Sequence, residues 1–435
     1  MAVFDYMPMG AAGLREIYAW IDDFVKKNEE IAEKTVLGRS EDGKWEIPAI
    51  IVTNKSISMD EKQIAIVTLC RHGNEEGGKV VGPEILNYLA GDEAGATRDK
   101  QAVIVVPICN PEGVVLNEFH STIAGITDLE KEIMGNLTAE YPPDMMIDYH
   151  SLGNKQGSIY DRGDMEVVIP GNTTRWGMDE QIYQYVADKM VKAAEARGFP
   201  YEIHTLEDLA AYYFGEKGNP RLPWRYQKEK VFLLNIQNFH EHYDARKGFG
   251  GYTNYTCAPA YLKWHTLVFG METNHWSIKP DEGLGESGLF PCQALLNLGN
   301  SRLPWEKDPG YPTNLICGDF RISVRALGKT PGERRASRAK IWNEKENFSL
   351  IERALIDPET TLAKVGYMGN NFPLEFAFCL RMRESTIRNV LVDDKEAAFE
   401  TFQDRCATFL YIPISMQREG VLRLKIIHEP FRKAR

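Results

Sequence analysis

The sequence predicts an α/β domain with a mostly parallel or mixed twisted sheet and helices on both faces, followed by an all-β, sandwich-like domain. Short apolar runs alternate with stretches of helical periodicity up to about residue 300, a segment with three prolines and a glycine follows, and short alternating runs come after it. A chain of 435 residues also exceeds what one hydrophobic core usually supports. We therefore expect an α/β domain at 1–302, a linker at 303–313 and a β-rich domain at 314–435.

The α/β domain should begin with a helix over residues 11–33, because apolar side chains recur there at helical spacing opposite a charged face. Two strands around an Asp42-Gly43 turn should come next. The remaining elements follow from apolar runs of strand length and from longer periodic stretches. Strands are expected at 63–70, 102–109, 144–150 and 265–272, and helices at 79–90, 180–197 and in the region before Asn300.

The β-rich domain is predicted from short alternating runs that are separated by polar turns, a pattern typical of a sandwich. The runs are DFRISVRAL, SRAKIW, LEFAFCLRM, TIRNVLV, ATFLYIPIS and VLRLKII. An arginine-rich stretch, 321–340, overlaps the first two runs. We interpret this stretch as a solvated loop.

Composition limits the partners of the chain. A net charge of −11 argues against a nucleic-acid backbone as the main partner, and no apolar stretch reaches the roughly 18 residues that a membrane helix requires. The N-terminus lacks a basic region followed by an apolar core, so no signal peptide is expected. Seven cysteines with scattered spacing fit reduced thiols, which favours a cytoplasmic protein over a disulfide framework.

Several apolar runs end in side chains that bind metals or polarise substrates. The run QIAIVTLC leads to His72 and Glu75, VIVVPICN ends in Asn110, MMIDYHS carries His150, and the last run ends in Glu272. In open α/β sheets, ligands bind outside the carboxyl ends of the strands. We therefore expect these residues to converge, although they are far apart in the sequence.

A His and a Glu three residues apart, with one distant His, form the ligand set of an open catalytic zinc site. His72 and Glu75 follow a strand and stand among glycines that permit a sharp turn, so we predict that they bind Zn²⁺ with His150. Asp148 shares a strand face with His150 and can orient its imidazole. The alternative interpretation of His150 is a buried histidine that is hydrogen-bonded to its neighbours.

Two other histidine patterns have plainer interpretations. His204 and Glu207 repeat the spacing of the predicted ligand pair, but they open an amphipathic stretch, where capping and surface polarity explain them. His240 and His242 are separated by one residue, yet no flanking strand or third ligand accompanies them. We interpret them as part of a polar loop.

Five segments, in order, resemble the zinc carboxypeptidase family of metallopeptidases, the funnelins. They are LGRSEDGKWEIPAIIV, HGNEEGG, VPICNPEGV, IDYHS and TLVFGMET. The resemblance extends over most of residues 1–300 and implies a carboxypeptidase-like fold. It also implies zinc held by His72, Glu75 and His150, with Glu272 as the base that takes a proton from water and returns it to the leaving amine.

The sequence departs from the family where the substrate's terminal carboxylate is bound. Family members place arginines between the segment that corresponds to VPICNPEGV and the third ligand, but no arginine stands between Gly113 and His150. Arg is the residue best suited to binding a carboxylate with two hydrogen bonds. Substitutes could come from elsewhere in the chain, namely from Arg71, Arg162, Arg221, Arg225 or Arg246.

Further substrate contacts are expected from Asn110 and from a Gly-rich loop, YDARKGFGGYTNY, which resembles the loop over the family's active site. Tyr243, Tyr252 or Tyr255 could supply its phenol, and surface aromatic residues are the alternative interpretation. Arg71, Asn110, Tyr243 and Tyr252 are the predicted substrate-binding residues.

The leading hypothesis is a zinc metallopeptidase that hydrolyses peptides or peptide-like amides. A second is an amidohydrolase of acyl amino acids that resembles the aspartoacylase and succinylglutamate desuccinylase branch. A third is a peptide- or carbohydrate-binding protein with a secondary zinc site. Neither the oligomeric state nor the role of the β-rich domain is predicted.

Overall fold

The computed structural model describes most of the chain. The described residues are 2–118, 128–151, 166–170, 180–199, 201–203, 260, 264–273, 278–300, 316–317, 320–344, 347–404 and 407–431. The chain divides into two compact units, Met1–Leu303 and Pro304–Arg435. The segment predicted as a linker, 303–313, lies outside the described residues.

The first unit is built on a mixed sheet of eight strands in the order β1-β2-β4-β3-β5-β8-β6-β7. The strands are β1 (Ala32–Arg39), β2 (Glu46–Val52), β3 (Gln63–Thr68), β4 (Gln101–Val106), β5 (Met145–Ser151), β6 (Glu166–Pro170), β7 (Tyr201–Ile203) and β8 (Leu267–Thr273). The central strands β4, β3, β5 and β8 run parallel. β1 pairs antiparallel with β2, β2 with β4 and β6 with β8, whereas β6 and β7 are parallel to each other. The mixed sheet that the sequence predicts is confirmed.

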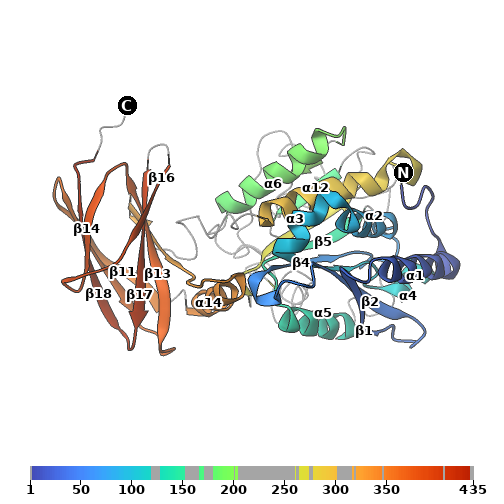
Figure 1. Ribbon diagram of the computed structural model, residues 1–435, viewed down its shortest axis with the longest axis horizontal. Helices are drawn as coiled ribbons and strands as arrows, with labels where there is room; N and C mark the ends of the chain where they lie inside the picture. The colour runs from blue at the N-terminus through green and yellow to red at the C-terminus, as the bar shows by residue number, and fades with distance from the viewer. Residues whose placement is uncertain are drawn as a thin grey trace, which may run out of the picture. The chain divides into compact units, whose positions relative to one another are not determined.

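Helices cover both faces of this sheet. They are α1 (Gly10–Lys27), α2 (Gly78–Ala90), α3 (Gly95–Lys100), α4 (Pro111–Leu116), α5 (Asp128–Glu140), α6 (Glu180–Glu195) and α12 (Leu284–Gly299), with 3-10 turns at Met59–Glu61, Asp92–Ala94 and Pro280–Glu282. In Figure 1, α2, α3, α6 and α12 lie on one face of the sheet, and α1, α4 and α5 lie on the other. None of the helices in the described ranges is long and apolar enough to cross a membrane.

The first helix shows how periodicity fixes a position in the fold. Leu14, Ile17, Ile21 and Phe24 are buried at helical spacing and present an apolar face to the sheet. The helix ends at Lys27, earlier than the predicted residue 33, because the side-chain amide of Asn28 donates to the carbonyl of Phe24 and the chain turns into β1.

The second unit consists of two antiparallel sheets that share one hydrophobic core. Their orders are β16-β17-β13-β10-β9 and β11-β12-β18-β14-β15. The strands are β9 (Ile316–Cys317), β10 (Phe320–Arg325), β11 (Phe348–Asp357), β12 (Thr360–Tyr367), β13 (Leu374–Arg383), β14 (Ile387–Val392), β15 (Lys395–Glu396), β16 (Glu400–Asp404), β17 (Ala407–Met416) and β18 (Gly420–His428). Phe376 and Ile412 of one sheet and Val365 and Leu424 of the other belong to a single buried cluster. The predicted sandwich is confirmed.

Two predictions in this unit are wrong. The run SRAKIW is not a strand, and the stretch 321–340 is not a solvated loop, because most of it forms β10 and the helix α14 (Pro331–Glu344). The reason lies at the start of the helix, where the backbone N–H of Glu333 donates to Thr330 Oγ1 and the carboxylate of Glu333 accepts from the N–H of Thr330. This reciprocal pair is a capping box, and Pro331 stands at a position that favours helix initiation.

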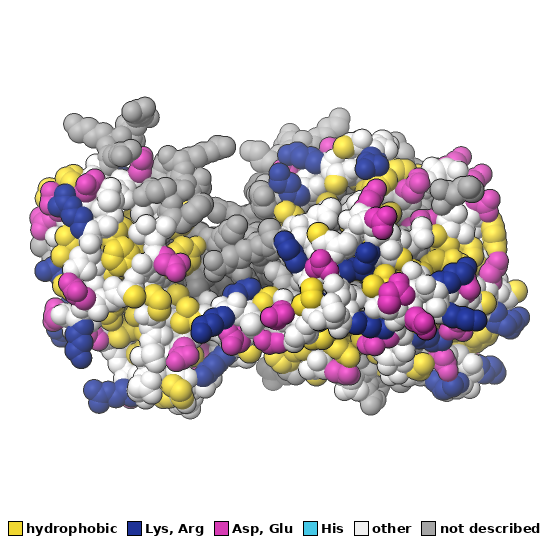
Figure 2. All heavy atoms as spheres, viewed as in Figure 1, with side chains coloured by type: hydrophobic (Ala, Val, Ile, Leu, Met, Phe, Trp, Pro, Cys, Tyr) yellow, Lys and Arg dark blue, Asp and Glu magenta, His cyan; other side chains and the backbone are white. Residues whose placement is uncertain are grey.

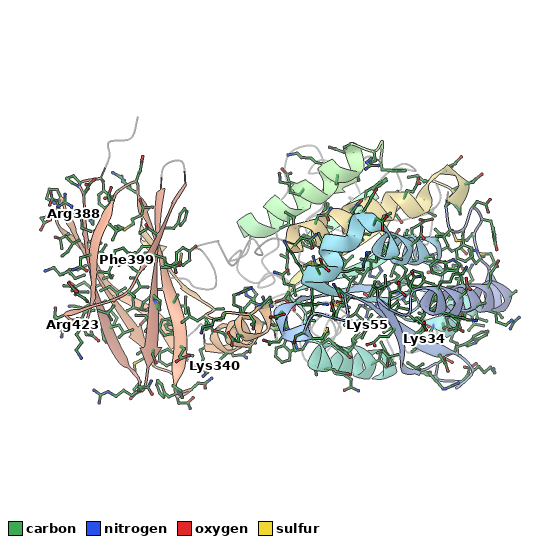
Figure 3. All side chains as sticks on the ribbon, in the orientation of Figure 1. Lys34, Lys55, Lys340, Arg388, Phe399 and Arg423 are labelled. Carbon is green, nitrogen blue, oxygen red and sulfur yellow. The ribbon has the colours of Figure 1, made fainter. Side chains whose placement is uncertain are left out.

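Charged side chains of both signs are interspersed over the face of the molecule drawn in Figure 2, and no histidine of the described residues is seen there. In the second unit, the side chains of Arg388 on β14 and Arg423 on β18 are exposed and leave the sheet away from its core (Figure 3). Arg388 Nη1 lies 3.1 Å from the carboxylate of Glu359.

Candidate metal centre

The turn after β3 is held by hydrogen bonds that continue the pairing of β3 and β4 beyond the ends of both strands. Leu69 N–H donates to the carbonyl of Val106, Cys109 N–H donates to the carbonyl of Leu69, and Asn110 N–H donates to the carbonyl of Cys70. Cys70 then adopts a left-handed conformation with φ of 52°. This change of direction starts the turn that carries His72 and Glu75.

Gly73 lets the turn lie directly against another segment of backbone. A Cβ atom at this position would stand 1.9 Å from the carbonyl carbon of Gly113, which is far inside contact distance. The N–H of Gly113 donates to the side-chain oxygen of Asn110, which caps α4, and the Asn110 amide donates to the carbonyl of Arg71. The residues after β4 therefore support the turn after β3.

The predicted ligands converge at the carboxyl ends of β3 and β5. Donor atoms of His72, Glu75 and His150 all lie within 4.8 Å of one another, and the two imidazole rings have centroids 4.9 Å apart. Each of these side chains is at least largely buried. Zinc sites hold nitrogen and carboxylate oxygen ligands about 2.0–2.2 Å from the ion, so small side-chain movements bring this donor set onto one ion.

A second layer of contacts fixes the ring of His150. Its Nδ1 lies 2.9 Å from Glu75 Oε2, and its Nε2 lies 3.2 Å from Asp148 Oδ2. Asp148 Oδ1 accepts a hydrogen bond from Thr68 Oγ1, and Arg71 Nη1 lies 3.1 Å from Asp148 Oδ2. Asp148 therefore contacts Nε2 of His150, the ring nitrogen opposite the one that faces Glu75, as the sequence predicts for an orienting carboxylate.

The electrostatics of the cluster follow from its burial and from its charges. Burial favours the neutral imidazole of His150, but the carboxylates of Asp148 and Glu75 outweigh it and raise the pKa of His150 well above its usual 6.5. Burial raises the pKa of Glu75, which the neighbouring His150 partly offsets. Burial also acts on Asp148, yet His150, Arg71 and Thr68 together hold the pKa of Asp148 below its usual range.

The turn and the end of β5 are tied to each other. The N–H of Gly77 donates to Ser151 Oγ at 2.8 Å, and the N–H of Ser151 donates to Glu75 Oε2 at 3.3 Å. Ser151 was not predicted as a site residue, nor was Thr68. Their positions in the sequence could have indicated a place in the site, because Ser151 directly follows His150 and Thr68 ends the strand that leads into the turn.

Glu272 stands at the strand end where the sequence places it. In the parallel pairing of β5 and β8, Glu272 is the register partner of His150, so its backbone lies beside the predicted third ligand. The side chain of Glu272 is not among the described ones. Its role as a base therefore stays a prediction.

The predicted substrate-binding residues divide into two groups. Arg71 is 3% exposed and contacts Asp148, and Asn110 is 6% exposed and donates to the carbonyl of Arg71. These contacts favour a role in supporting the turn and its ligands over contact with substrate. Tyr243 and Tyr252 lie outside the described residues. So do the following residues from the other interpretations: Tyr255, Arg162, Arg221, Arg225, Arg246, His204, Glu207, His240 and His242.

Comparison with known proteins supports the family resemblance in the first unit. The family model for zinc carboxypeptidases matches residues 17–124, a segment that contains His72 and Glu75. No curated protein matches the sequence. The resemblance inferred from the sequence motifs is therefore confirmed, and the matched segment ends before His150 and Glu272.

Solved structures of carboxypeptidases also resemble the chain at low identity. Carboxypeptidase A from Helicoverpa armigera is 12% identical, with a TM-score of 0.43, over 66% of this chain and 73% of the other. A metallo-carboxypeptidase from Burkholderia cenocepacia is 14% identical, with a TM-score of 0.44, over 65% of this chain and 68% of the other.

Proposed function

We propose that this chain, of which residues 17–124 match the zinc carboxypeptidase model, is a zinc-dependent metallopeptidase that hydrolyses peptide or peptide-like amide bonds. The observation that carries the proposal is the convergence of His72, Glu75 and His150 at the carboxyl ends of parallel strands. Two neutral imidazoles and a carboxylate suit Zn²⁺ and leave a position open for water or substrate.

His72, Glu75 and His150 would hold the zinc, which when bound would supply a water of lowered pKa and a Lewis acid for the scissile carbonyl. The protein's own residues orient and protect that chemistry. Asp148 holds Nε2 of His150, so that Nδ1 points toward the carboxylate of Glu75. Glu272, whose backbone pairs with His150, takes a proton from the attacking water and passes it to the leaving amine.

The test is digestion of a defined peptide library by zinc-loaded protein, followed by mass spectrometry. The library contains each peptide with a free and with an amidated C-terminus, together with N-acyl amino acids. The Glu272→Gln variant removes the base while it keeps the volume of the side chain, and we expect turnover to fall about 10²–10⁴-fold with zinc retained. Glu93→Gln, at an exposed position of the same unit, is the matched control and should leave turnover unchanged.

The products decide between the hypotheses. Removal of single residues only from free C-termini supports a carboxypeptidase, and cleavage confined to N-acyl amino acids supports the amidohydrolase alternative. If no product depends on Glu272, the proposed enzyme is wrong and the zinc-containing binding protein becomes the better hypothesis.

A further inference from the structure

Arg71 stands where a charged side chain needs a structural or chemical reason. It lies in the turn after β3, immediately before His72. Its side chain is 3% exposed, and that of its partner Asp148 is 1% exposed. A guanidinium in such an interior is stable only when it is paired and hydrogen-bonded. The pairing with Asp148, at 3.1 Å, supplies that partner.

Both oxygens of the Asp148 carboxylate are engaged. Thr68 Oγ1 donates to Oδ1 at 2.9 Å, while Arg71 Nη1 and His150 Nε2 lie 3.1 Å and 3.2 Å from Oδ2. With donors on both sides, the carboxylate cannot rotate about its last side-chain bond without losing at least one of them. Its oxygen therefore stays opposite Nε2 of His150.

We propose that Arg71 is a positioning residue that acts through Asp148 to set the orientation of the His150 imidazole. The inference rests on the proposed function, because it assigns His150 to the zinc site. Arg71 and Thr68 fix the carboxylate, the carboxylate fixes Nε2, and the opposite ring nitrogen, Nδ1, is left facing Glu75 at 2.9 Å. A metal-binding histidine held in this way needs no reorientation when zinc arrives.

The competing role for Arg71 is a clamp for the carboxylate of a substrate. A clamp must expose its guanidinium to the site, whereas Arg71 is buried and its Nη1 is directed to Asp148, on the side of His150 away from Glu75. The two roles also predict different measurements. A clamp changes KM and leaves zinc affinity unchanged, whereas a positioning residue changes zinc affinity in the absence of any substrate.

The test is a double-mutant cycle on zinc affinity, measured in the full-length protein by competition with a chromophoric chelator. Arg71→Met and Asp148→Asn are each expected to weaken zinc binding about 10–100-fold, the range typical of groups that support metal ligands. If Arg71 acts through Asp148, the double variant should bind zinc no more weakly than Asp148→Asn alone. Additive losses, or an Arg71→Met variant with wild-type affinity, would overturn the proposal.

Two further variants separate positioning from general damage. Arg98 donates hydrogen bonds to the carbonyls of Leu89 and Gly91, remote from the cluster, so Arg98→Met controls for loss of a partly buried arginine and should keep its zinc affinity. Arg71→Lys keeps the charge and should recover part of the affinity lost in Arg71→Met. It also keeps the cycle usable if the methionine variant does not fold.

A spectroscopic readout reports on the histidine itself. In zinc-loaded protein labelled with ¹⁵N-histidine, the Nε2 proton of His150 should give a slowly exchanging, downfield resonance. That resonance should persist in Arg98→Met and should be lost or exchange faster in Arg71→Met. An unchanged resonance in Arg71→Met would overturn the proposal.

The zinc measurements also distinguish this inference from the proposed function. A wild-type protein that binds zinc, shows the non-additive cycle and hydrolyses no library member keeps the positioning role and loses the peptidase assignment. A protein that hydrolyses peptides but shows additive losses keeps the function and loses the positioning role. A wild-type protein that binds no zinc overturns both.

Discussion

Two arginine–carboxylate pairs, one in each unit, have the same separation and different surroundings. Arg71 and Asp148 are 3.1 Å apart with side chains 3% and 1% exposed, whereas Arg388 and Glu359 are 3.1 Å apart with side chains 48% and 47% exposed. Distance alone therefore does not tell what a salt bridge contributes. The contribution of each pair to stability depends on how far its charges are removed from water and on which neighbouring groups replace the water.

The two units also differ in whether they hold a candidate metal centre. Among the described residues, the first unit holds the one cluster of His, Cys, Asp and Glu side chains that could ligate a metal, and that cluster is buried at one edge of the sheet. The second unit is built around aromatic and aliphatic side chains, and the ion pairs described there are exposed. The buried charged cluster at the carboxyl ends of the central strands therefore points to chemistry in the first unit.

The sharpest way to test this comparison is to break the buried pair. In metal-free protein, Arg71→Met should lower the free energy of unfolding of the first unit by at most about 3–5 kcal/mol, because it removes one of the two cationic partners of the buried Asp148 carboxylate and leaves only His150. Denaturant unfolding followed by circular dichroism measures the change. The double variant Arg71→Met/Asp148→Leu removes both charges and should recover only part of the loss, because Thr68 and His150 then lose their acceptor. A loss below about 1 kcal/mol would mean that this buried pair contributes no more to stability than an exposed pair.

Protonation of the buried cluster gives the next largest effect. The pKa of His150 is raised above 6.5 in the metal-free protein, so the ring is protonated near neutral pH and must lose a proton to bind zinc. Zinc affinity should therefore rise about tenfold per pH unit as the pH increases above 6.5, and it should level off above the raised pKa. Calorimetric titrations in buffers with different ionisation enthalpies measure the released proton, and an affinity independent of pH between 6.5 and 8 would contradict the assignment.

The sequence predicted the strands that form the site better than the contacts of the polar side chains around it. The runs that end near His72 and His150 are strongly apolar, and parallel central strands are buried on both faces, so apolarity alone located them. The convergence of their carboxyl ends followed from the parallel arrangement. The contacts of Arg71 with Asp148 and of Asn110 with the Arg71 carbonyl could not be predicted, because the sequence cannot tell whether a polar side chain at a strand end points toward substrate or under the turn.

The error at α14 has a different cause. The run SRAKIW alternates apolar and polar residues over too few positions to separate a strand from a helix. The deciding signal stood just upstream, where Thr330 and Glu333 form a capping box around Pro331. A local hydrogen-bond pattern at the start of the element therefore carried more information than the periodicity within it.

Asn110 provides a smaller test of how the turn is supported. Asn110→Ala removes the cap of α4 and the amide that reaches the Arg71 carbonyl, and it should lower the free energy of unfolding of the first unit by about 0.5–2 kcal/mol. Asn110→Ser keeps a capping oxygen and loses the amide, so it should fall between the wild type and Asn110→Ala. Equal losses in the two variants would mean that the cap contributes little. A change in substrate KM without a change in stability would instead support the substrate contact that the sequence predicts.

The smallest effect is expected at the exposed pair, which completes the comparison. Arg388→Met should change the free energy of unfolding of the second unit by less than about 1 kcal/mol, because water already solvates both charges and the side chains lose entropy when they pair. The effect should shrink further in 0.5 M salt, which screens exposed charges, whereas the loss in Arg71→Met should change little. Unfolding of both variants at low and high salt measures this difference. A large, salt-insensitive loss at Arg388 would show that the sandwich also relies on a charged contact and that exposure does not separate the two pairs.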